Sequence, residues 1–266
     1  MNKQKKSLSI STMLSTTLIL TLSAFATYAD KLIYSPKSAV AKLAAAKFSY
    51  FSESAAAKLS YSPESAPFNT KFKEWSAQWW QFMLSFPVAV NPLLDEKCVV
   101  GQRGSVWFLS GGDGFETSHT CTIPAGKSLF FPLLSLATIG DPYISADELR
   151  ADIAPCLDTV TAVSVEVDDN SIIRFNKINK FRVKSEVFDV TLPEENLFSL
   201  VGDVPPGTYS PAVADGFYVM LKPLKVGDHT VHISAVMPGI KDYDACADPM
   251  SLDVTYTLTV VPVTLK

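Results

Sequence analysis

Large apolar side chains recur every three or four positions from Phe68 to Phe86, which is the period of one face of an α-helix. The pattern predicts a helix packed on a sheet, with Asn69 or Thr70 as its N-terminal cap and Pro87 ending it. Trp80 falls outside the apolar row, so we expect its ring to be the exposed one.

Beyond this helix the chain is dominated by short stretches in which apolar and polar residues alternate, as they do in half-buried strands. Ser145 and Glu148 have capping-box spacing and introduce one further helix. No strand–helix–strand repeat is present, so we predict a mainly β fold, an antiparallel β-sandwich with one or two packed α-helices, stapled by disulfides. The predicted strands are 105–109, 128–136, 163–167, 181–187, 216–221, 229–237 and 252–260.

The first 66 residues differ in composition from the rest of the chain. Residues 1–29 have the basic start, the apolar run and the small closing residues of a secretory signal peptide, with a cut expected after Ala29 or Ala26. Residues 30–66 form a low-complexity repeat arm, and residues 67–266 are expected to form a single β-sandwich-type domain. The mature protein is expected to be exported, to the periplasm or outside the cell, without a membrane-inserted segment.

The arm contains three copies of one unit that is rich in Lys, Tyr, Ser and Ala. The copies are residues 31–41, 47–57 and 58–66, and the last two follow each other directly. A flexible linker is one interpretation of such a repeat, and an arm through which the protein self-associates is the other.

Four cysteines in an exported chain predict two disulfides. Three pairings are open, of which we favour Cys98–Cys121 and Cys156–Cys246. Zinc is disfavoured because the chain has no CxxC spacing and no histidine at finger spacing from a cysteine.

Composition and charge narrow the classes of partner. A hydrophobic fraction of 47% excludes wholesale disorder. The chain has 23 basic and 27 acidic residues, and removal of a leader with three lysines leaves 20 against 27, a net charge of −7. A chain this acidic carries no electrostatic footprint for nucleic acid or for anionic lipid.

Few residues suggest catalysis or metal binding. Glu116 and His119, beside a glycine cluster expected to be a loop, could form an acid–base pair, with Asp215 converging on the same cleft. No resident cofactor is expected, and calcium is the remaining ion to consider. Its candidate ligands are the carboxylates of Asp242, Asp244 and Asp248.

Aromatic residues are the candidates for ligand binding, because sugar rings stack on aromatic faces. The candidates are Trp80, Trp107, Phe217 and Tyr218, each of which also suits a place in the core.

Several distinctive motifs occur along the predicted domain. They are Trp75-x-x-x-Trp79-Trp80-Gln81, Gly101-Gln102 with Val106-Trp107-Phe108-Leu109, Cys121-x-x-Pro124-Ala125-Gly126-Lys127 before Leu129-Phe130-Phe131-Pro132, Arg182-Val183-x-Ser185, Asp215 to Leu224, Gly227-x-His229-Thr230 and Asp253 to Val260. Together they resemble a family of uncharacterised exported bacterial proteins over roughly residues 70–262. The resemblance implies export but no activity, and it does not extend to the repeat arm.

Three functions follow from these patterns. The favoured one is an exported non-enzymatic binding or surface-structural protein, with carbohydrate or an envelope polymer as the first ligand to test. The second is a secreted hydrolase or lyase that acts on envelope polymer and uses Glu116, His119 and Asp215. The third is an extracellular matrix or filament subunit that assembles through residues 30–66.

Overall fold

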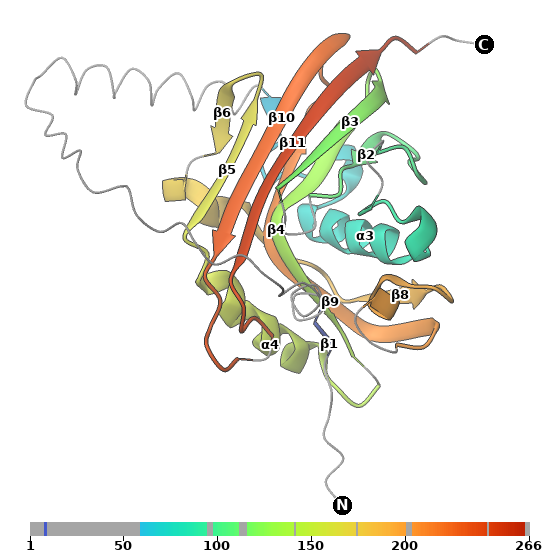
Figure 1. The fold of residues 1–266 in the computed structure, drawn as a ribbon, viewed down its shortest axis with the longest axis vertical. Coiled ribbons are helices and arrows are strands. Elements are labelled where there is room, and N and C mark those ends of the chain that lie inside the picture. The colour runs from blue at the N-terminus through green and yellow to red at the C-terminus, as the bar shows by residue number, and fades with distance from the viewer. Residues whose placement is uncertain are drawn as a thin grey trace, which may run out of the picture.

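The protein, seen here in a computed structural model, is built from two β-sheets packed face to face (Figure 1). The structure describes residues 8–9, 59–94, 98–111, 116–140, 142–173, 175–200, 204–243 and 245–263. The predicted signal peptide lies outside these ranges except for β1 (Leu8–Ser9), whose backbone pairs with β4. The first two repeat copies also lie outside the described residues.

We call the two sheets the central sheet and the outer sheet. Together with the two helices they confirm the predicted mainly β sandwich. The central sheet has the order β1-β4-β9-β7, with β2 beside β4 and β8 beside β9, and the outer sheet has the order β3-β11-β10-β5-β6. The elements after β1 are β2 (Val106–Phe108), β3 (Glu116–Pro124), β4 (Ser128–Ile139), β5 (Ala162–Val167), β6 (Asn170–Ile173), β7 (Arg182–Lys184), β8 (Phe188–Leu192), β9 (Gly207–Leu221), β10 (Gly227–Met237), β11 (Met250–Val261), α3 (Phe72–Leu84), α4 (Ala146–Asp158) and the 3-10 helices Pro67–Asn69, Val88–Val90, Phe175–Phe181 and Leu197–Leu200.

The central sheet is buried on both faces. Phe131 and Val219 point into the core shared with the outer sheet, whereas Phe130, Tyr218 and Met220 point into a second core beneath α3. A strand covered on both faces needs apolar residues at every position rather than at alternate ones. This explains why β4 and the second half of β9 read as continuous apolar runs.

Helix α3 covers the face of the central sheet that is turned away from the outer sheet (Figure 1). It begins one or two residues later than predicted, because Phe68 and Asn69 adopt left-handed backbone angles, with φ of 60° and 57°. The Lys71 amide, which caps the helix, donates to the Glu74 carboxylate at 3.0 Å. No helix within the described ranges has the length and apolar character needed to cross a bilayer.

Helix α4 is capped as predicted, with the Glu148 amide donating to Ser145 Oγ at 3.2 Å. Its apolar row closes one end of the core between the sheets. Near its C-terminus, Cys156 is bonded to Cys246 in the segment after β10, which confirms the favoured pairing. The other predicted disulfide, Cys98–Cys121, is also present.

The structure corrects several predicted strands. β9 begins at Gly207, well before residue 216, and only residues 182–184 of the predicted 181–187 strand pair with it. Glu116 to His119 lie in β3 and not in a loop, since β3 pairs in parallel with β11. A second parallel pair joins β2 to β4. These pairings join segments far apart in the sequence, and local alternation carries no signal for them.

Arg182 links three elements through a partly buried ion pair. Its guanidinium donates to both carboxylate oxygens of Asp215 on β9, at 2.8 and 3.0 Å, and to the Ala154 carbonyl of α4 at 3.1 Å. It also pairs with the exposed Asp158. The hydrogen bond that Arg182 donates to Asp215 is the largest influence and raises the pKa of Arg182 above its ordinary value, against an opposing effect of burial. Asp215 is only 2% exposed, so Arg182 is what compensates its charge.

Arg182→Ala is expected to lower the free energy of unfolding by about 3 kcal/mol, because it leaves the buried Asp215 carboxylate uncompensated. Lys184→Ala, an exposed position on the same strand, should cost less than about 0.5 kcal/mol. Urea denaturation of both variants checks this. Equal losses from the two would contradict the role assigned to Arg182.

His229 ties β10 to the turn between β5 and β6. Its Nδ1 lies 2.7 Å from Asp168 Oδ2, and its Nε2 lies 2.9 Å from the Lys225 carbonyl. Both partners are acceptors, so both ring nitrogens must carry protons for both bonds to form. Burial lowers the pKa of His229, but the bonds to Asp168 and Lys225 outweigh it and raise that pKa above 6.5.

A raised folded-state pKa gives stability that is fully present below the unfolded value and is lost as pH rises through the folded value. The free energy of unfolding of the parent should therefore exceed that of His229→Gln most at about pH 5.5, and the excess should shrink by about pH 8.5. Urea titrations at the two pH values measure it. A difference that does not change with pH would be the contrary result.

Candidate functional site

An open groove of about 520 Å³ lies between α3 and the segment that leads into β2. Four half-buried aromatic rings line it, three from the helix and its C-terminal extension and one from β2. Polar side chains line the rest of the groove. The rings belong to Trp75, Phe82, Phe86 and Phe108, and the polar side chains named below are Gln78, Gln81, Gln102 and Arg103.

The four rings form a continuous row. The centroid of Phe108 lies 6.2 Å from that of Trp75 and 5.2 Å from that of Phe82, and Phe86 lies 5.2 Å beyond Phe82. All three contacts are edge-on, with interplanar angles of 60° to 73°. Edge-on packing is a favourable arrangement for aromatic pairs and holds the row together without a ligand.

Helix spacing explains why these rings are not fully buried. Phe72, Trp79 and Met83 lie at the centre of the buried face of α3. Trp75 and Phe82 lie on the flank of that face, where they meet the Phe108 ring of β2. A side chain on the flank of a helix face contacts the core on one side and is exposed to solvent on the other.

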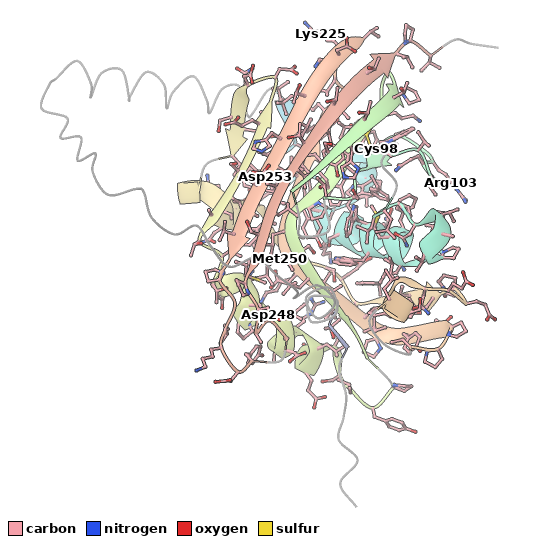
Figure 2. The ribbon with its side chains drawn as sticks, viewed as in Figure 1. Cys98, Arg103, Lys225, Asp248, Met250 and Asp253 are labelled. Carbon is pink, nitrogen blue, oxygen red and sulfur yellow. A yellow bond between two sulfur atoms is a disulfide. The ribbon has the colours of Figure 1, made fainter. Side chains whose placement is uncertain are left out.

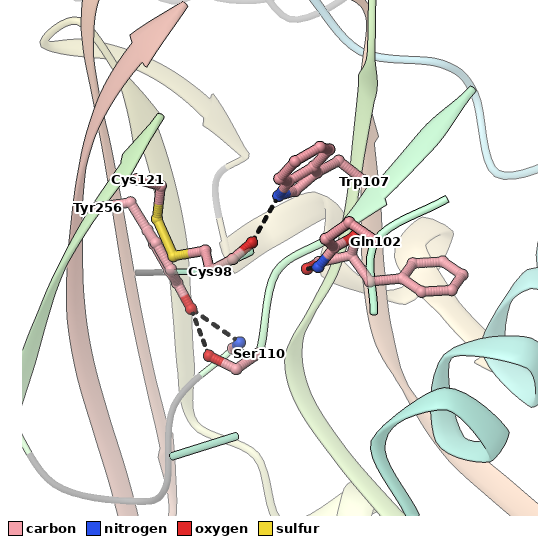
Figure 3. The surroundings of a disulfide bond; sticks show 8 residues. Cys98, Gln102, Trp107, Ser110, Cys121 and Tyr256 are labelled. Carbon is pink, nitrogen blue, oxygen red and sulfur yellow. Dashed lines mark hydrogen bonds between the residues drawn. A yellow bond between two sulfur atoms is a disulfide. The ribbon is translucent and has the colours of Figure 1, made fainter. Parts of the chain in front are cut away.

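The opposite wall of the groove is fixed by polar contacts. Gln102 donates to the Phe108 carbonyl at 2.7 Å and accepts from the Phe108 amide at 2.9 Å. The Trp107 indole donates to the Cys98 carbonyl at 2.9 Å, and the Cys98–Cys121 disulfide joins this segment to β3 (Figure 3). The segment between the cysteine and β2 is therefore held at both ends.

The groove offers hydrogen-bonding groups beside the rings. Gln81 donates to the Asp189 carbonyl at 2.9 Å, which leaves its amide oxygen as an acceptor. Within the described part of the chain, no hydrogen bond or ion pair engages the side chain of Gln78 or of Arg103. Figure 2 shows Arg103 projecting outward from the segment before β2. The described lining contains no carboxylate and no histidine.

The four aromatic residues expected to bind a ligand lie elsewhere. Trp80, Trp107, Phe217 and Tyr218 are 4%, 8%, 2% and 0% exposed, so none presents a free ring face at the surface. The exposure expected for Trp80 is wrong, since its indole donates to Ser135 Oγ at 3.0 Å and Tyr218 Oη at 3.1 Å in the core. Burial also raises the pKa of the Tyr218 hydroxyl.

The three candidate catalytic residues do not lie in the groove. Asp215 belongs to the central sheet and pairs with Arg182. His119 belongs to the outer sheet, is 6% exposed and stacks on Tyr256 with ring centroids 4.7 Å apart. Glu116 is the first residue of β3, and its side chain lies outside the described part of the structure.

The candidate calcium ligands lie only partly within the described residues. Asp242 and Asp248 are exposed, and Asp244 lies outside the described residues. The described ranges contain no group of three or more His, Cys, Asp or Glu side chains arranged to hold a metal ion.

Sequence reasoning assigned the groove aromatics to the helix core and missed them as a site. One signal pointed to them. Gln78 lies in the same row of the helix as Trp75 and Phe82, at spacings of three and four, so a polar residue interrupts a row that a core contact would keep apolar. The part played by Phe108 depends on the parallel pairing of β2 with β4, which has no local signal.

Comparison with known proteins gives no family. No protein-family model and no curated protein matches this chain. Among solved structures, a cysteine protease inhibitor from Entamoeba histolytica is 16% identical, with a TM-score of 0.18 over 55% of this chain and 87% of its own. A pilin subunit from enterotoxigenic Escherichia coli is 11% identical, with a TM-score of 0.18 over 56% and 92% of the two chains.

Gly101 allows the segment to lie against the ring row. A Cβ at this position would lie 2.2 Å from Phe86 Cζ and 3.0 Å from Phe82 Cε2, and its φ is +66°. Gly104 provides a matched comparison, because its φ is +65° and a Cβ there would meet nothing within 4 Å. A side chain at either position would impose similar backbone strain, but only a side chain at position 101 would also collide with the rings.

Gly104→Ala should lower the free energy of unfolding by about 1 kcal/mol through backbone strain alone. Gly101→Ala must also displace Phe86, so its loss should be larger by about 1 kcal/mol or more. Guanidinium denaturation of the two variants gives both values. Equal losses would show that the segment does not press on the ring row.

Proposed function

We propose that this is an exported, non-enzymatic protein that binds a carbohydrate chain in the aromatic groove between α3 and β2. The single observation that carries the proposal is the row of four half-buried rings, flanked by unengaged polar side chains. The favoured ligand class is an uncharged glycan of the cell envelope or of the surroundings.

The two disulfide bonds support export. Both disulfides join segments of the folded domain, and such bonds persist in oxidising compartments. The leader-like composition of residues 1–29 points the same way. A protein with these properties meets polysaccharides rather than cytoplasmic metabolites.

A glycan suits the chemistry of the groove. The apolar face of a pyranose ring packs on an aromatic face, and its hydroxyls both donate and accept hydrogen bonds. Gln78 and Gln81 each supply amide groups of both kinds, and Arg103 supplies further donors. An open groove, unlike a closed pocket, admits a section of a long polymer.

Binding without catalysis is favoured over the hydrolase alternative. General acid–base chemistry needs a titratable group within reach of the substrate, and the described lining of the groove offers no carboxylate or histidine. The residues considered for catalysis belong to other parts of the two sheets. The function we assign to the groove is therefore recognition.

The test is an oligosaccharide array probed with the exported chain, followed by calorimetric titration of the strongest hit. Phe86→Ala should raise Kd about tenfold or more, because it removes one ring of the row. Tyr143→Ala is the matched control: Tyr143 is an aromatic residue that is 81% exposed and lies outside the groove lining, so its loss should leave Kd unchanged.

A second pair of variants separates polar recognition from packing. Gln78→Ala should weaken binding of the same glycan by about fivefold, because one hydrogen bond is lost. Lys73→Ala changes an exposed residue of the same helix and should leave the affinity unchanged. Thermal unfolding confirms that all four variants fold. An array without hits, or affinity that is unchanged in both Phe86→Ala and Gln78→Ala, would refute the proposal.

A further inference from the structure

The third repeat copy is part of the folded domain and occupies a defined position on β9. The Lys222 amide donates to the Leu59 carbonyl at 2.8 Å, and the Tyr61 amide donates to the Met220 carbonyl at 2.9 Å. Ser60 lies opposite Leu221 in this antiparallel bridge. We call this position, residues 220–222 of β9 and its extension, the repeat slot.

The repeat slot continues the edge of β9 that β8 and β7 occupy. β8 pairs with β9 between residues 207 and 212, β7 pairs between 215 and 217, and the third repeat copy follows at 220–222. The opposite edge of β9 is paired with β4. The repeat slot is thus the last stretch of an edge that is otherwise closed, and an added strand is what fills it.

Side chains of the third copy add selectivity to these backbone bonds. Leu59 packs against the core between the sheets, and Ser60 is 8% exposed. The Tyr61 ring lies edge-on to Phe68 with centroids 6.4 Å apart, and Lys222 Nζ lies 5.6 Å from its centroid. The repeat slot therefore selects an extended segment with an apolar residue, a small residue and a tyrosine in succession.

The same three-residue pattern occurs eleven residues upstream. Phe48, Ser49 and Tyr50 of the second copy correspond to Leu59, Ser60 and Tyr61. The second copy keeps serine at the buried position, whereas the first copy has the larger, branched Ile33 there. Close-packed positions do not accept such an increase without strain. The Leu59 position is only partly buried, so a larger apolar side chain there can extend toward solvent, and the sequence of the second copy therefore suits the repeat slot better than that of the first.

We propose that the repeat slot is a strand-addition site with two ligands in its own chain, the third repeat copy and the second. The arm docks in either of two registers eleven residues apart, and the second register places more of the chain between the repeat slot and Pro67. Docking within one molecule is favoured over docking between molecules, because a short tether gives an effective concentration of the order of millimolar.

The test uses the exported full-length chain and the exchange rate of the Lys222 amide, which reports occupancy of the repeat slot. Leu59→Gly/Tyr61→Pro removes the apolar contact, the tyrosine ring and the Tyr61 donor from the third copy. Phe48→Gly/Tyr50→Pro makes the matched change in the second copy. A fourth protein carries all four changes.

Changing either copy alone should slow or speed exchange at Lys222 by less than about tenfold, because the other copy fills the repeat slot. Changing both should speed exchange by about a hundredfold or more. The Ile233 amide in the twice-paired strand β10 serves as the folding control and should stay protected in every variant.

Two results would overturn the proposal. Exchange in Leu59→Gly/Tyr61→Pro as fast as in the fourfold variant, with Ile233 still protected, would show that the second copy does not enter the repeat slot. Protection that rises with protein concentration in Leu59→Gly/Tyr61→Pro would show that the second copy comes from another molecule.

Discussion

Burial of the β4–β9 pair on both faces is the constraint on which the rest of the structure depends. The outer sheet covers one face of this pair and α3 covers the other, so two cores share the same strands. The helix that covers the second face is rich in aromatic residues. Its apolar face is wider than the part of it that the sheet buries. The excess rings on its flank meet β2 and form the groove. The groove is in this sense a consequence of having a middle layer.

How much of the fold is predictable from sequence depends on whether a local pattern specifies the element. The helices α3 and α4, both disulfides and the strands β5, β10 and β11 are predictable, because each follows from a local periodicity or from the compartment. The parallel pairs β3–β11 and β2–β4 do not follow, since pairing between distant segments leaves no local pattern. The site depends on one of these pairs: Phe108 joins the ring row only because β2 lies beside β4. The exposure of Trp80 was mispredicted because hydrogen bonds to Ser135 and Tyr218 make a polar edge acceptable inside the second core.

The repeat slot and the groove share one feature: in both, a segment from elsewhere in the chain lies against the central sheet or the helix that covers it. β9 is filled in succession by β8, β7 and the third repeat copy along one edge. Phe68, which contacts Tyr61 on one side and Trp75 on the other, places the docked repeat near the start of the ring row.

The most direct test of the central claim is an amide and indole resonance map of the exported chain during titration with envelope oligosaccharides. Ligand in the groove should shift the Trp75 indole and the Gln78 side-chain amide, while the Trp79 and Trp107 indoles, whose donors are bonded to the Leu109 and Cys98 carbonyls in the interior, stay in place. Saturable binding that leaves Trp75 and Gln78 unmoved and shifts residues elsewhere would contradict it.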